Sequence, residues 1–161
     1  MVSACALFFG CAYKHIGGIG DSSRFSGIHV KIFANKTSRS GLETMVTQSL
    51  IDELAKHNAG NLVDEASAHF ILSGTVLSYT VAPVSYTAAD LIAGYRATLS
   101  LSATLTERDT GKVVWKGEMS GSQDYPVNAD ISLQQNSEAA AVVEISRRLA
   151  ERIHENMQED F

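Results

Sequence analysis

The residues of this chain that could do chemistry are two cysteines, five histidines and a few acidic pairs. Both cysteines, Cys5 and Cys11, lie in the first eleven residues, and the nearest histidine is His15. A disulfide between them would close only a small loop at the terminus, and a zinc site would lack ligands. The cysteines therefore predict neither, and Cys11 is instead a candidate for modification.

The histidines lie singly on different predicted elements, which predicts surface or helix-end roles and neither a metal nor a cofactor. They are His15, His29, His57, His69 and His154. The chain has no HExxH, CxxC, GxSxG or phosphate-binding glycine loop. The pairs Asp64-Glu65 and Glu159-Asp160 are typical of solvated charge, because acid–base catalysis needs carboxylates in an enclosed cleft. These observations predict that the protein is not an enzyme.

The first residues resemble a lipoprotein processing site. A short apolar run, Val2–Gly10, ends with a small residue directly before Cys11. Lipoprotein signal peptidase requires this arrangement, although the charged leader of a signal peptide is missing. We interpret residues 1–10 as a truncated signal peptide, Cys11 as the lipidated residue and 11–27 as the lipidated N-terminus with a glycine-rich tether. The alternative is an ordinary buried cysteine on a short apolar segment.

Composition predicts one domain over residues 28–161, since 161 residues have room for a single core. The net charge of −5 and the scattered Lys and Arg residues argue against nucleic acid as a partner. No window reaches the ~18 apolar residues that a membrane span needs.

Hydrophobic periodicity predicts the elements of this domain. Alternating residues predict a strand at 28–33 and a hairpin formed by strands at 95–107 and 112–122, with Val113, Trp115 and Met119 on one face. A further strand covers 70–81, where Pro83 should end it. Helical stripes follow Ser40 to about His57 and run from about 133 to 158. The order β-α-β-β-β-α indicates an α+β two-layer sandwich: a four-stranded mixed sheet with two helices on one face.

The strand at 95–107 has an unusual polar side. Its outward residues carry hydroxyl groups where an exposed sheet would normally carry mixed charges; they are Thr98, Ser100, Ser102, Thr104 and Thr106. Threonine also has good β propensity, so composition alone explains this hydroxyl ladder about as well as function does. The functional interpretation is a face that docks against another polar, uncharged wall.

Several segments together resemble the LptE family of lipopolysaccharide-assembly lipoproteins, in order and spacing over about residues 10 to 155. They are Gly10-Cys11-Ala12-Tyr13-Lys14, Val30–Thr37, Gly41-Leu42-Glu43, Gly74-Thr75-Val76, Ser78-Tyr79, Pro83–Tyr86 and Gly121–Val127. The resemblance implies a protein anchored through acyl chains on Cys11 to the periplasmic face of the Gram-negative outer membrane. It also implies a plug inside the LptD β-barrel that assists lipopolysaccharide insertion.

The family resemblance further implies basic side chains that meet lipopolysaccharide phosphates near one end of the sheet. Here 86–94 and 125–137 contain no Lys or Arg, which leaves Arg96, Lys112 and Lys116 as candidates. The ladder residues are the candidates for barrel contact. An alternative is another periplasm-facing envelope lipoprotein, such as a TolB-like or curli-secretion-type binding module.

Overall fold

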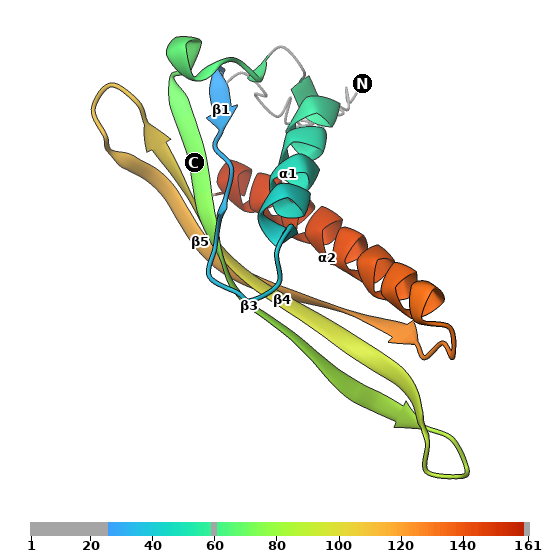
Figure 1. The fold of residues 1–161 in the computed structure, drawn as a ribbon. Helices are drawn as coiled ribbons and strands as arrows, with labels where there is room; N and C mark the ends of the chain where they lie inside the picture. The colour runs from blue at the N-terminus through green and yellow to red at the C-terminus, as the bar shows by residue number, and fades with distance from the viewer. Residues whose placement is uncertain (1–25, 59–60, 160–161) are drawn as a thin grey trace, which may run out of the picture.

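The protein forms two layers, a long sheet and a pair of helices (Figure 1). The computed structural model describes residues 26–58 and 61–159. Along the chain, the elements are β1 (Ile28–Val30), β2 (Ala34–Asn35), α1 (Leu42–Asn58), a 3₁₀ turn (Glu65–Ser67), β3 (Phe70–Tyr86), β4 (Ile92–Glu107), β5 (Val113–Pro126) and α2 (Ile131–Glu159). The predicted α+β class and the order β-α-β-β-β-α are confirmed, with β2 as an additional short strand.

The sheet is mixed, as predicted. Its order is β1-β3-β4-β5, and β2 pairs with β3 on the same side as β1. Both short strands run parallel to β3, whereas the three long strands are antiparallel. Because β1 and β2 pair with β3 only as far as Val76, the second half of β3 is an edge strand. There the β3–β4 hairpin extends past both helices (Figure 1).

The helices cover one face of the sheet, which we call the inner face. The predicted stripe on α1 is buried at Leu42, Val46, Leu50 and Leu54 and partly buried at Met45, and the stripe on α2 is buried at Val142, Ile145, Leu149 and Ile153. On β4 they meet Ala97, Leu99, Leu101, Ala103 and Leu105, all completely buried. Burial of this apolar area is the main source of stability. No helix in the described residues is long and apolar enough to cross a membrane.

The first predicted strand is wrong in its second half. Alternation over 28–33 would place Ile32 inside, but β1 ends at Val30, and Ile32 is 76% exposed while Phe33 is 2% exposed. The backbone N–H of Phe33 donates to Thr47 Oγ1 at 3.0 Å, which fixes this segment against α1. The break after Val30 shifts the alternation by one residue, so Phe33 enters the core.

The end of β3 and the orientation of Val113 also differ from prediction. Pro83 does not end β3, because it lies on the edge half of the strand, where its missing N–H leaves no ladder bond unmade. Val113 does not share a face with Trp115 and Met119. An irregularity between Leu105 and Thr106 pairs Val113 with Thr106, and leaves Val113 52% exposed.

Candidate functional site

The side of the sheet opposite the helices carries hydroxyl groups on all three long strands. The register places Thr80 and Ser122 on either side of Thr98, and Ser78 and Ser120 on either side of Ser100. The ladder is therefore the centre of a wider surface. We call this surface the hydroxyl face; it consists of Ser73, Thr75, Ser78, Thr80, Thr98, Ser100, Ser102, Thr104, Thr106, Ser120 and Ser122.

No described part of the chain covers the hydroxyl face. Both helices lie on the other side of the sheet (Figure 1), and each hydroxyl-face residue is at least partly exposed. Some of its polar groups bond to one another: Ser100 Oγ donates to Ser120 Oγ at 3.0 Å, and Ser120 Oγ donates to the Leu99 carbonyl at 3.2 Å. The face can therefore offer both donors and acceptors to a polar partner.

Charged residues on this side are few: the exposed Glu118 lies opposite Ser102 in the middle, and the candidate cations lie towards the two ends. Arg96 and Asp124 face each other across β4 and β5 in a two-pronged ion pair, Nε to Oδ1 at 2.6 Å and a terminal guanidinium nitrogen to Oδ2 at 2.8 Å. The hydrogen bond from Arg96 lowers the pKa of Asp124 below its ordinary value. The charge of Arg96 is thus largely compensated by its own neighbour.

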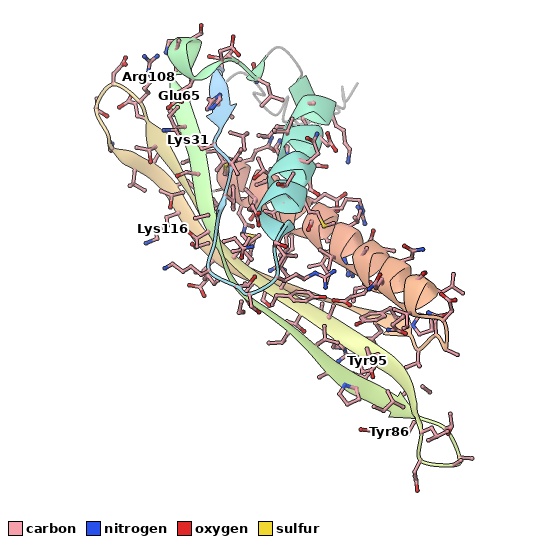
Figure 2. The ribbon with its side chains drawn as sticks, viewed as in Figure 1. Lys31, Glu65, Tyr86, Tyr95, Arg108 and Lys116 are labelled. Carbon is pink, nitrogen blue, oxygen red and sulfur yellow. The ribbon has the colours of Figure 1, made fainter. Side chains whose placement is uncertain are left out.

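The other two candidate cations lie far from Arg96. Lys116 pairs in register with Thr104 and is exposed, and Figure 2 shows it pointing away from the helices. Eight residues of β4 separate Thr104 from Arg96, about 26 Å at ~3.3 Å per residue. Lys112 lies farther still, at the β4–β5 turn, where its carbonyl accepts from the Glu107 N–H. The three cations therefore form no single cluster.

The projecting hairpin is apolar, a feature that the sequence analysis did not identify. Its exposed side chains include Val81, Val84, Tyr86, Leu91 and Ile92, and Figure 2 places Tyr86 near the tip. At the base of the hairpin, Val84, Arg96 and Asp124 help to line an open depression of about 360 Å³. The available sequence signal was the apolar pattern that continues beyond Pro83, which the assumed strand end concealed.

A polar contact fixes the sheet to the helical layer where β3 leaves the core. Tyr79 Oη donates to Glu138 Oε1 on α2 at 2.7 Å, and Arg39 pairs with the same oxygen. The Arg39 guanidinium lies 5.2 Å from the centre of the Tyr79 ring, within range of a cation–π contact. Burial, followed by the hydrogen bond to Glu138, raises the pKa of Tyr79. This contact joins β3 to α2 and to the segment before α1.

The prediction that each histidine lies singly is wrong for His57 and His154. The two rings stack, with centroids 4.0 Å apart, and His57 Nε2 lies 3.0 Å from Glu53 Oε1. Burial and the nearby His57 lower the pKa of His154. Sequence spacing could relate Glu53 to His57, four residues apart on α1, but gave no signal for the contact with α2. Cys11, the predicted lipidation site, lies outside the described residues.

The fold and surface together define a class: a small α+β module with one helix-covered face and one open polar face. The family model for lipopolysaccharide-assembly LptE proteins matches residues 25–157. The chain belongs to this LptE family, a non-catalytic lipoprotein family of the Gram-negative envelope. A search of curated proteins finds no match.

Solved structures share the fold at low sequence identity. Rare lipoprotein B from Shewanella oneidensis aligns with a TM-score of 0.54 and 16% identity, over 81% of this chain and 94% of that one. A lipoprotein candidate from Caulobacter crescentus aligns with a TM-score of 0.64 and 15% identity, over 86% and 92% of the two chains. At such identities the alignments support the fold alone.

Proposed function

We propose that the protein is a lipid-anchored plug and assembly factor of an LptD-type outer-membrane β-barrel, where it assists lipopolysaccharide insertion into the outer leaflet. The observation that carries the proposal is the hydroxyl face, which is uncovered and polar, with Glu118, opposite Ser102, as the charged residue nearest its middle. The interior of a large outer-membrane barrel is polar, so such a face can exchange hydrogen bonds with water for hydrogen bonds with the barrel wall.

The proposal assigns the anchor to Cys11. One acyl chain binds membranes only marginally, so the several chains of a mature lipoprotein are needed for firm attachment. Purification from membranes followed by mass measurement of the N-terminal peptide should detect acyl chains on Cys11. Cys11→Ala should release the protein from the membrane fraction when the barrel is absent; an unmodified Cys11 in membrane-bound protein would contradict the anchor.

Contact with lipopolysaccharide is assigned to the exposed cations at the two ends of the open side, Arg96, Lys112 and Lys116. Since Asp124 compensates Arg96, the two lysines carry the larger share of free positive charge. Lys116→Ala should therefore weaken lipopolysaccharide binding more than Arg96→Ala does. Equal binding by the parent and the variants Arg96→Ala, Lys112→Ala and Lys116→Ala would remove this part of the proposal.

The barrel assignment is tested by adding charge to the hydroxyl face. Thr98→Lys places an ammonium group on the central strand of the face, between Thr80 and Ser122. The matched control is Thr44→Lys, which adds the same group at an exposed position on α1. Inside a barrel the first lysine would lose water without gaining a paired charge, whereas the second would stay solvated.

Co-purification with the barrel is the measurement. We expect Thr98→Lys to reduce recovery of the barrel at least tenfold and Thr44→Lys to leave it unchanged, with both variants folded by circular dichroism. If both variants recover the barrel as the parent does, the hydroxyl face is not the contact surface. If the folded parent recovers no barrel from membranes, the plug role itself is wrong.

A further inference from the structure

The end of the helical layer holds a cluster of metal-binding side chains from two helices. Glu53 and His57 lie one turn apart near the end of α1, and His154 lies near the end of α2. The potential ligand atoms of the three residues all lie within 4.8 Å of one another. The cluster is on the helical side of the molecule and is therefore separate from the hydroxyl face.

We propose that Glu53, His57 and His154 bind one divalent transition-metal ion of the zinc class, which links the last turns of α1 and α2. Two imidazoles and one carboxylate form a donor set that suits zinc, and three protein ligands leave a position for water. Magnesium and calcium prefer oxygen ligands alone, so this set discriminates against them.

The Glu53 carboxylate is held so that one oxygen could bind the ion while the other stays bonded to Lys56. Glu53 is 5% exposed, and Lys56 Nζ contacts its Oε2 at 2.8 Å while His57 Nε2 contacts its Oε1 at 3.0 Å. An ion would take over Oε1 from His57, and Lys56 would keep its bond to Oε2. A bond to the second oxygen orients a ligating carboxylate and supports metal affinity.

At least one histidine ring must rotate for the two to converge on an ion. They are nearly parallel, with 15° between their planes, so their in-plane lone pairs do not yet meet at one point. Ligand atoms around a tetrahedral zinc ion are about 3.3 Å apart, given bonds of 2.0 to 2.1 Å. The His57 side chain is half exposed and can rotate, whereas Gln158 Nε2 contacts His154 Nε2 at 3.0 Å and restrains that ring.

Binding is measured by calorimetric titration of Zn²⁺ into the tag-free full chain. All samples carry Cys5→Ala, Cys11→Ala and His15→Ala, because these side chains can also bind zinc. The test variants are His57→Ala and His154→Gln, and the matched control is His69→Ala, which removes an exposed histidine away from the cluster. Mg²⁺ and Ca²⁺ serve as control ions.

We expect one zinc ion per chain, at least tenfold weaker binding in each test variant, and unchanged binding in the His69→Ala control. Neither Mg²⁺ nor Ca²⁺ should bind. Zinc should raise the thermal unfolding midpoint of the parent but not of His57→Ala, because an ion that binds only the folded state stabilises it. If His154→Gln does not fold, the exposed His57 still decides the question.

Histidine ring signals in nitrogen-edited NMR spectra provide the residue-specific measurement. Zinc should shift the ring nitrogens of His57 and His154 and leave those of His29 and His69 in place. Equal affinity in the parent and His57→Ala, or zinc-dependent shifts confined to His29 or His69, would overturn the proposal. Neither outcome bears on the barrel contact, since the cluster and the hydroxyl face lie on opposite sides of the sheet.

Discussion

The two faces of β4 share one backbone but obey different constraints. On the inner face, Leu99 and Leu101 are completely buried against the helices. One residue further along in each case, Ser100 and Ser102 remain partly exposed on the hydroxyl face. Both sets of residues lie between the same two neighbouring strands, β3 and β5, although they pair with different residues there. The difference shows that the inner face determines whether the chain folds, while the outer face is free to be selected for what it contacts.

The largest expected effect separates these two faces directly. Leu101→Ala removes a completely buried side chain and leaves a cavity, so it should lower the free energy of unfolding by roughly 2 to 5 kcal/mol. Its neighbour Ser102 lies on the hydroxyl face, and Ser102→Ala should change the free energy by about 0.5 kcal/mol or less. Urea denaturation of both variants gives the comparison, and similar losses would mean that the outer face is also structural.

The inner face and the hydroxyl face can also be compared on β3, by deleting one hydroxyl group from each. Tyr79→Phe removes the bond to Glu138 and should cost about 1.5 kcal/mol, because the lost bond is to a charged group. Thr80→Val deletes a hydroxyl on the exposed side at nearly constant volume and should be close to neutral. Denaturant unfolding measures both. A neutral Tyr79→Phe would show that Arg39 alone satisfies Glu138.

Much of the fold could be predicted because alternation is a local signal. On β4, the type of each residue, apolar or hydroxyl-bearing, predicts which face of the sheet its side chain occupies. The apolar stripes of the helices repeat every three or four residues. Strands, helices and their order can therefore be predicted from short stretches of sequence. The hydroxyl ladder was found in the same way. Its extension onto β3 and β5 depended on register, which fixes which residues lie opposite one another.

The errors arise where a distant partner decides the structure. Phe33 is buried because Thr47 on α1 binds its backbone, and Val113 is exposed because the pairing of β4 and β5 is irregular beside it. Pro83 is tolerated because no strand lies beyond the edge half of β3. The contact of His57 with His154 joins residues almost a hundred positions apart, and no local pattern could reveal it.

The smallest expected effect concerns the ion pair at the hairpin end of the open side. Both side chains of the pair are about half exposed, so water and salt screen it strongly. Arg96→Ala and Asp124→Asn should each lower the thermal unfolding midpoint only slightly, and 1 M salt should remove most of the difference. A large loss that persists in salt would place Arg96 among the structural residues and weaken the contrast between the faces.

The difference in thermal unfolding midpoint between the parent and Asp124→Asn should depend on pH in a definite direction. The bond from Arg96 holds the pKa of Asp124 below its ordinary value, so the pair stabilises the folded state above the unfolded carboxyl pKa of about 3.9. The contribution is lost as the pH falls through the lower, folded-state pKa. The midpoints of the parent and Asp124→Asn should therefore differ at pH 7 and converge in acid.

Asp124→Asn also releases the charge of Arg96, so it should strengthen lipopolysaccharide binding while it slightly weakens the fold. These opposite signs would separate the contact role of the open face from its structural role.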